Sequence, residues 1–101
     1  MKYQVSARPG PIPPPPEVFD AALGWLEAKV SDGTFDCVYG FLSGGGFSVA
    51  NAESHGEVFE LMADYPLFGF SEWDVQPLLT LGEQRETVRA KLAEAQAAMG
   101  G

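Results

Sequence analysis

The stretch YPLFGFSEWDVQPL, residues Tyr65 to Leu78, decides how this chain folds. Pro66 has no backbone donor, so it ends any helix that runs up to Tyr65. From Phe70 to Gln76, apolar residues such as Trp73 and Val75 alternate with acidic or amide residues. This period of two is typical of a strand with one apolar face. The stretch therefore predicts a helix end followed at once by a half-buried strand.

The residues before this stretch predict the helix that Pro66 ends. Ser54 and Glu57 have the S-x-x-E spacing of a capping box, in which each side chain satisfies a backbone donor at the helix start. An apolar stripe follows at helical spacing, formed by Val58, Leu61, Met62 and Tyr65.

The N-terminal part predicts a strand, a stiff connector and a first helix. KYQVSAR, Lys2 to Arg8, alternates apolar and polar residues and reads as a strand. PGPIPPPP, Pro9 to Pro16, is extended, because proline fixes φ; we favour a rigid spacer over a ligand for an aromatic groove such as that of an SH3 domain. Pro16 suits a first helical turn and Gly33 a helix end. The expected apolar stripe of this helix is Phe19, Leu23, Leu26 and Val30.

Trp25 falls to one side of that stripe, where it either covers the edge of the core or meets a partner chain. Next, TFDCVYGF (Thr34 to Phe41) and FSVANA (Phe47 to Ala52) are rich in aromatic and β-branched residues and predict two strands. SGGG, Ser43 to Gly46, joins them as a hairpin turn. We favour a flexible turn over a phosphate loop, because no Lys-Ser/Thr pair follows and the glycines join two strands rather than a strand and a helix.

The last segment predicts a third helix. Thr80 and Glu83 repeat the capping-box spacing. Val88, Leu92, Ala95 and Met99 recur on one side of the helix that follows. The order is β-α-β-β-α-β plus one helix, so we expect an α+β, ferredoxin-like domain over residues 1–81 and a helical extension over residues 82–101.

The bulk properties exclude several classes of function. The chain has 101 residues, which suits one domain, and a net charge of −8, which disfavours nucleic acid as a partner. Cys37 is the only cysteine, so neither an intrachain disulfide nor a cysteine-based zinc site is possible within one chain. The N-terminus lacks the apolar core of a secretory signal and no apolar run is long enough for a bilayer. We expect no membrane association and a cytoplasmic location.

Six polar residues are expected on the sheet face that the helices leave open. They are Gln4, Ser6 and Arg8 of the first strand and Glu72, Asp74 and Gln76 of the last. We expect these two strands not to be neighbours within one chain, so that the two sets line one cavity only in a dimer. Alternation of this kind is also what a solvated strand face shows, so both interpretations remain open.

Each candidate has a chemical role in such a cavity. Glu72 or Asp74 is the expected proton carrier, because a partly dry site raises a carboxyl pKa toward that of a general base. Arg8 is the expected anchor for a carboxylate or enolate. Tyr39, together with Gln4, Ser6 and Gln76, is the expected set of substrate-binding groups, and Tyr3 is a further hydroxyl of this kind.

Two other reactive side chains are interpreted as structural. His55 falls in the first turn of the second helix, so we expect an exposed histidine without an orienting partner. Cys37 lies among large apolar residues, so we expect a buried, inert thiol. We find no pattern of metal ligands, no catalytic Ser/His/Asp spacing and no dinucleotide fingerprint, and we expect no metal and no cofactor.

The opening stretch also resembles the C-terminal segment of muconolactone isomerases. The matching residues are Pro66, Leu67, Phe68, Phe70, Pro77 and Leu78. NAESHGEVFELMADYPLF (Asn51 to Phe68), the early prolines and the helix end DGTF (Asp32 to Phe35) resemble that family as well. The resemblance spans about residues 1–80 and does not include the last helix.

The resemblance implies a dimeric α+β barrel, a homodimer or higher oligomer in which two sheets meet face to face around a pocket for a small molecule. It implies a cofactor-independent isomerase or cyclase that moves a proton on a small metabolite. Two alternatives stay open: a non-catalytic module for small-molecule binding or oligomerisation, and a cofactor-free monooxygenase.

Overall fold

The expected alternation of strands and helices is present in the computed structural model, which describes residues 1–100. Gly101, the last residue of the predicted extension, lies outside them. The elements are β1 (Lys2–Pro9), α1 (Pro16–Ser31), β2 (Phe35–Gly40), β3 (Gly46–Asn51), α2 (His55–Asp64), a 3₁₀ turn η1 (Phe68–Phe70), β4 (Ser71–Leu78) and α3 (Leu81–Gly100). The α+β, ferredoxin-like fold class predicted from the sequence is confirmed.

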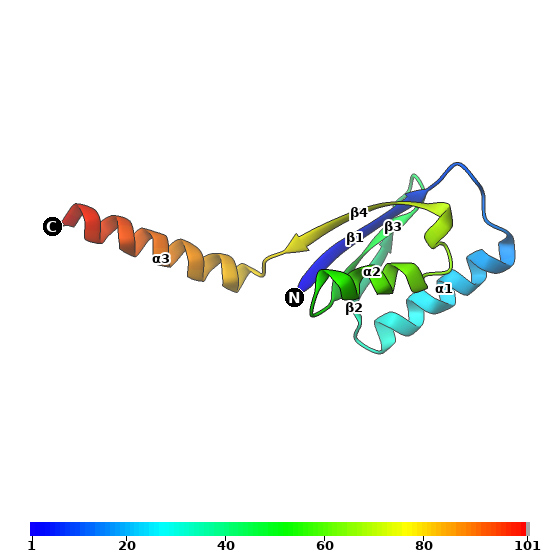
Figure 1. The fold of residues 1–101 in the computed structure, drawn as a ribbon, viewed down its shortest axis with the longest axis horizontal. Coiled ribbons are helices and arrows are strands. Elements are labelled where there is room, and N and C mark those ends of the chain that lie inside the picture. The colour runs from blue at the N-terminus through cyan, green and yellow to red at the C-terminus, as the bar shows by residue number, and fades with distance from the viewer. Residues whose placement is uncertain (101) are drawn as a thin grey trace.

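The four strands form one antiparallel sheet in the order β2-β3-β1-β4. The expectation that the first and last strands are not neighbours is wrong, because β4 pairs with β1 along its whole length. The connection through α2 carries the chain past β1, so that β4 joins the free side of that strand (Figure 1). Glu72 therefore lies opposite Arg8, and Asp74 opposite Ser6, within a single chain.

Helices α1 and α2 both cover one face of the sheet (Figure 1). The buried core forms between them and the strands, around Tyr3, Val5, Phe35, Ala50, Ala52 and Val58. The predicted stripe of α2 is correct, because Val58 is buried and Leu61 and Met62 pack against the core. The other face of the sheet carries no helix, and we refer to it as the open face.

The predicted apolar stripe of α1 is correct at Leu26, which packs against the core, and wrong at its other three positions. Phe19, Leu23 and Val30 are 50%, 48% and 42% exposed, whereas Ala22 is 1% exposed. The helix is rotated so that Ala22 and Trp25 face the sheet, and Trp25 packs against Phe35 with ring centroids 5.7 Å apart. The small Ala22 side chain lets the helix approach closely, and the indole of Trp25 buries more apolar area than Phe19 would.

Local signals in the sequence are otherwise accurate. Gly44 and Gly45 have φ of 103° and 74°, as the predicted hairpin turn requires. The Ser54 hydroxyl accepts from the Glu57 backbone N–H at 3.2 Å. At the start of α3, the Thr80 hydroxyl accepts from the Glu83 N–H at 3.1 Å, and the Glu83 carboxylate accepts from the Thr80 N–H, also at 3.1 Å.

Helix α3 leaves the domain and projects as an arm beyond the end of β4 (Figure 1). The chain measures 67 Å along its longest axis and 28 × 24 Å across it. None of the residues of α3 is buried. The arm therefore adds no side chain to the core.

Candidate functional site

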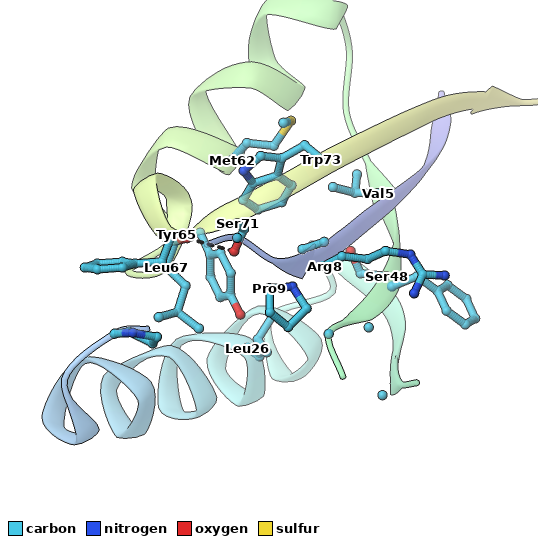
Figure 2. Close-up of a pocket in the computed structure, with 18 of the residues that line it drawn as sticks. Val5, Arg8, Pro9, Leu26, Ser48, Met62, Tyr65, Leu67, Ser71 and Trp73 are labelled. Atoms are coloured by element: carbon cyan, nitrogen blue, oxygen red, sulfur yellow. Dashed lines mark hydrogen bonds between the residues drawn. The ribbon is translucent and has the colours of Figure 1, made fainter. Parts of the chain in front are cut away.

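A cavity of about 430 Å³ lies between the helix-covered face of the sheet and the two helices. Its walls include Val5 and Ser48 from the sheet, Leu26 from α1, and Met62 and Tyr65 from the end of α2 (Figure 2). Most of the lining is aliphatic or aromatic. This size and lining are typical of sites for small organic ligands, which measure ~300–1,000 Å³.

The proline segment forms part of the cavity wall. Residues 9–14 all line the cavity, so the segment is more than the spacer that the sequence predicts. The backbone N–H of Gly10 donates to the Phe70 carbonyl at 2.8 Å and ties the segment to η1. A Cβ on Gly10 would lie 2.9 Å from that carbonyl oxygen, so only glycine allows this close approach. A stiff segment held at this point keeps the wall in place with little loss of entropy on ligand binding.

Three hydroxyl groups in the lining have no hydrogen-bond partner among residues 1–100, namely those of Tyr39, Ser48 and Tyr65. Tyr39 is 62% exposed, so the sheltered hydroxyls are the other two. Ser48 is 6% exposed and is the one buried polar residue of the described chain. Neither the Ser48 nor the Tyr65 hydroxyl takes part in a hydrogen bond between residues 1 and 100. No fully buried side-chain oxygen in that range is without a partner, so both hydroxyls border open space. They are therefore free to bond a ligand atom.

Tyr65 is held in a nest of aromatic rings. Its ring centroid lies 5.3 Å from that of Trp25 and 5.7 Å from that of Trp73. The Trp73 indole N–H donates to the Phe68 carbonyl at 3.1 Å, which fixes the indole against the cavity. Figure 2 shows Tyr65 reaching from the end of α2 toward α1. Trp25 thus belongs to the cavity wall. Of the two roles considered for it, covering the edge of the core and meeting a partner chain, the structure shows the first.

Burial raises the pKa of Tyr65 above its ordinary value of 10.0. The phenol is therefore neutral over the physiological range and acts as a hydrogen-bond donor and acceptor rather than as a base. No carboxylate and no imidazole lines the cavity among the described residues. The chemistry that this lining supports is the binding and orientation of a ligand oxygen.

Of the seven site residues predicted from the sequence, two border the cavity, namely Arg8 and Tyr39, although the strand register places both side chains on the open face. The other five lie outside its lining: Gln4, Ser6, Glu72, Asp74 and Gln76. These five share the open face, as expected from the alternation of the strands. Direct pairing places Ser6 opposite Asp74 and Gln4 opposite Gln76, so the polar set is gathered within one chain.

The Arg8 side chain is directed toward the hairpin rather than toward its cross-strand neighbour Glu72. Its guanidinium lies 4.7 Å from the centre of the Phe41 ring and donates to the Ser43 hydroxyl at 3.5 Å. Figure 2 shows it turned away from Tyr65 and Trp73. Among the described residues, no ion pair joins Arg8 to Glu72 or Asp74. Arg8 is thus at the border of the cavity, and its charge does not point at the two free hydroxyls.

His55 is exposed at the start of α2, as predicted, but it does have a partner. The buried Tyr3 hydroxyl lies 2.8 Å from His55 Nδ1. This pair does not line the cavity. Cys37 is only partly buried and pairs with Val49, which places it on the open face rather than in the core as expected. No group of three or more potential metal ligands occurs within residues 1–100.

Sequence reasoning missed Ser48 and Trp73 as cavity residues. The alternation of FSVANA puts Ser48 on the same side as Ala50, and this side faces the helices. A hydroxyl on the apolar face of a strand is the signal that was available, since such a group needs either a protein partner or a ligand. The cavity itself was not predictable, because it depends on how far α1 stands from the sheet.

Comparisons with known proteins give a likeness of fold and none of sequence. No family model and no curated protein matches the chain. A crystal structure of muconolactone isomerase superposes with a TM-score of 0.66 at 16% identity, over 79% of this chain and 90% of that one. A 5-chloro-2-hydroxyhydroquinone dehydrochlorinase (TftG) from Burkholderia phenoliruptrix AC1100, in complex with 2,5-dihydroxybenzoquinone, gives 0.61 at 17% identity, over 78% of this chain and 94% of that one.

These matches support the α+β, ferredoxin-like fold that the resemblance implied. At 16–17% identity they show a common fold and not a common activity. Both neighbours are named for reactions on small molecules. No helix within residues 1–100 is both long and apolar enough to cross a bilayer.

Proposed function

We propose that this chain binds a small, uncharged ring compound in the cavity between the sheet and the two helices. The observation that carries the proposal is the pairing of an apolar cavity of about 430 Å³ with two unpaired hydroxyls, on Ser48 and Tyr65. The aromatic nest supplies stacking surfaces, and the hydroxyls supply hydrogen bonds to a carbonyl or hydroxyl oxygen. The quinone in the structure of the dehydrochlorinase is a small ring compound with carbonyl oxygens, although its acidic hydroxyls are ionised at neutral pH.

The lining favours a neutral ligand over an anion. Arg8 is the one cationic side chain in the lining, and its guanidinium is engaged by Phe41 and Ser43. A carboxylate placed at the two hydroxyls would lose its hydration without gaining a counter-charge, which is costly. A ketone, lactone or phenol loses much less.

Isothermal titration calorimetry with a matched pair of ligands tests this proposal. The neutral probe is p-cresol, and the charged probe is p-hydroxybenzoate, which differs by a carboxylate in place of the methyl group. We expect p-cresol to bind at least tenfold more tightly, and a Tyr65→Phe variant to weaken its binding. Leu23→Ala, which changes an exposed apolar residue of α1 outside the cavity, is the control and leaves binding unchanged. Equal binding of both probes, or none by either, contradicts the proposal.

As a second candidate, we propose cofactor-independent isomerisation or cyclisation by proton transfer at the open face. The favouring observation is the register of β1 and β4, which sets Asp74 opposite Ser6 and Glu72 opposite Arg8. In this scheme Glu72 or Asp74 carries the proton, Arg8 anchors an anion, and Gln4, Ser6, Tyr39 and Gln76 orient the substrate. All of these groups need a cover that excludes water, so this candidate requires a homodimer or higher oligomer.

Hydrogen exchange into an unsaturated lactone tests the second candidate. We expect the protein in D₂O to speed the loss of the proton signal of α-angelica lactone or muconolactone, followed by NMR. Glu72→Gln and Asp74→Asn should remove this effect while Glu60→Gln, on the exposed side of α2, retains it. Exchange that survives in both carboxylate variants rules out their role as proton carriers.

A further inference from the structure

Helix α3 presents an unpaired apolar stripe. Leu81, Val88, Leu92 and Met99 are 70%, 56%, 58% and 87% exposed. At ~3.6 residues per turn these four residues fall on one side of the helix, together with Ala95. Most of the stability of a protein helix comes from packing of its apolar face, and an apolar stripe that faces solvent is normally covered.

The charges of α3 are sorted around this stripe. Arg85, Arg89 and Lys91 flank the apolar residues at helical spacing, whereas Glu83, Glu86 and Glu94 fall on the reverse side. The helix is neutral in sum, so the net charge of −8 belongs to the rest of the chain. A stripe bordered by cations fits an acidic receiving surface. Two α3 helices stripe to stripe would instead bring like charges together.

The helix is not placed to cover its own domain. Only Leu79 and Thr80 separate it from β4, and the capping box between Thr80 and Glu83 is complete in both directions. Figure 1 shows α3 continuing away from the sheet along the course of β4. The arm therefore reaches a second molecule more readily than its own open face.

The open face offers the matching surface. On the β2–β3 side it carries an aromatic group in which the ring centroid of Phe47 lies 5.8 Å from that of Tyr39 and 5.8 Å from that of Phe41. Tyr39 is 62% exposed. On the β4 side it carries the exposed acids Glu72 and Asp74. Two residues along a strand span ~6.8 Å, close to the ~6 Å rise between helix positions four apart, such as Arg85 and Arg89.

We propose that α3 docks on the open face of a second copy of this chain. Its apolar stripe covers Tyr39 and Phe47, while Phe41 keeps its contact with the Arg8 guanidinium of the receiving copy. Arg85 and Arg89 pair with Glu72 and Asp74 of the other copy. The helix, ~30 Å long, spans the length of the strands. The inference shares with the second proposed function only the need for a second copy. A docked α3 would occupy Glu72 and Asp74, so docking and proton transfer by these acids exclude each other at one open face. Docking is independent of ligand binding in the cavity. In this arrangement the two sheets do not meet face to face. The open face of each copy is covered by α3 of the other copy.

A charge swap between two variants tests this docking by sedimentation velocity on the full chain. R85E/R89E and E72R/D74R each set like charges against each other, so each alone should be monomeric. Their mixture restores opposite charges at both contacts, so we expect it to form a heterodimer. Circular dichroism shows whether each variant is folded. A wild-type chain that is monomeric at high concentration, or a mixture that does not associate, overturns the proposal.

A second pair of variants tests the stripe. Leu92→Glu should raise the dissociation constant about tenfold to a hundredfold, which corresponds to the loss of one buried leucine. Ala90→Glu makes the same change of charge on the reverse side and should leave association unchanged. Equal effects of the two changes contradict the docking geometry. Binding of p-cresol should be unaffected in both variants, so failure of the docking and failure of the cavity proposal are distinguished.

An anionic membrane is the other surface that a cationic apolar helix fits. Flotation with vesicles of phosphatidylcholine and phosphatidylserine measures this directly. We expect the wild-type protein not to float, because the −8 charge of the domain is repelled. Flotation that Leu92→Glu abolishes would overturn docking between copies in favour of a lipid surface.

Discussion

Ser48 is the residue at which stability and binding are predicted to change in opposite directions. Its side chain is on a central strand, is 6% exposed and has no partner in the described part of the protein. A hydroxyl that is buried without a partner costs about 1–3 kcal/mol. Because this hydroxyl borders the cavity, the cost falls at the lower end of that range. Ser48→Val should therefore stabilise the fold, since valine also suits a strand.

The matched control is Ser48→Thr, which adds the same methyl volume and keeps the hydroxyl. We expect the valine variant to exceed the threonine variant by about 1–2 kcal/mol in the free energy of unfolding. In a domain of this size each kcal/mol raises the melting temperature by ~4–8 °C. Urea unfolding followed by tryptophan fluorescence measures the difference, and calorimetry with p-cresol should show that only the valine variant has lost affinity.

A threonine variant as stable as the valine variant would mean that the hydroxyl has a protein partner after all. A valine variant that keeps full affinity for p-cresol would mean that the hydroxyl does not contact the ligand. Either result refutes the reasoning that assigns Ser48 to the site.

Three further predictions concern ionisation and helix stability. Burial raises the pKa of Tyr65 above 10.0, so the phenol of the unfolded chain loses its proton at a lower pH than that of the folded chain. The contribution of Tyr65 to the free energy of unfolding should therefore be full below pH 10 and fall above it. Unfolding measured at pH 8–11 checks this, and the fall should be less steep in Tyr65→Phe. A hydrogen bond from Lys2, and to a smaller extent one from Asn51, lowers the pKa of Asp36 below 3.8. The contribution of Asp36 to stability is therefore present above pH 3.8 and lost as the pH falls through the pKa of the folded state. Lys2→Met should raise this pKa in an NMR titration, and an unchanged pKa would contradict the assigned cause. Thr80→Ala should reduce the helical signal in circular dichroism of the dilute monomer, because an undocked α3 depends on its cap and not on packing. An unchanged signal in the monomer would refute this.

The sequence predicts the fold well where a signal is local. Pro66, the two capping boxes and the glycine turn each act within a few residues, and each is found where expected. The alternation of β4 is also correct, since Trp73 and Val75 pack on the core while Glu72 is exposed. These features follow from backbone geometry and need no knowledge of distant contacts.

Features that depend on tertiary packing were less accessible. The buried face of α1 was misplaced because periodicity puts Phe19 and Leu26 on the same face. It gives no information about how closely the helix approaches the sheet, which the small Ala22 side chain permits. The pairing of β1 with β4 is a property of topology, and it brings Arg8 and Glu72 together in one chain. The cavity arises from the spacing between layers, which no short motif encodes.

The site residues also divide into those that a local pattern predicts and those that depend on tertiary packing. Polar alternation correctly gathers Glu72, Asp74 and Gln76 on one face, but it carries no information about where a cavity lies. The two hydroxyls that border the cavity come from a strand interior and from a helix end. They are recognised only when the absence of a protein partner is visible in the structure.

The central claim is that the cavity holds a neutral ring compound. Its most direct test is the ¹H–¹⁵N spectrum of the protein during titration with p-cresol, in which the two tryptophans give two indole N–H signals. Trp25 and Trp73 both line the cavity, so we predict that both signals shift with one saturating curve. If neither signal moves while backbone signals of Glu72 and Asp74 do, the ligand binds at the open face and the claim is wrong.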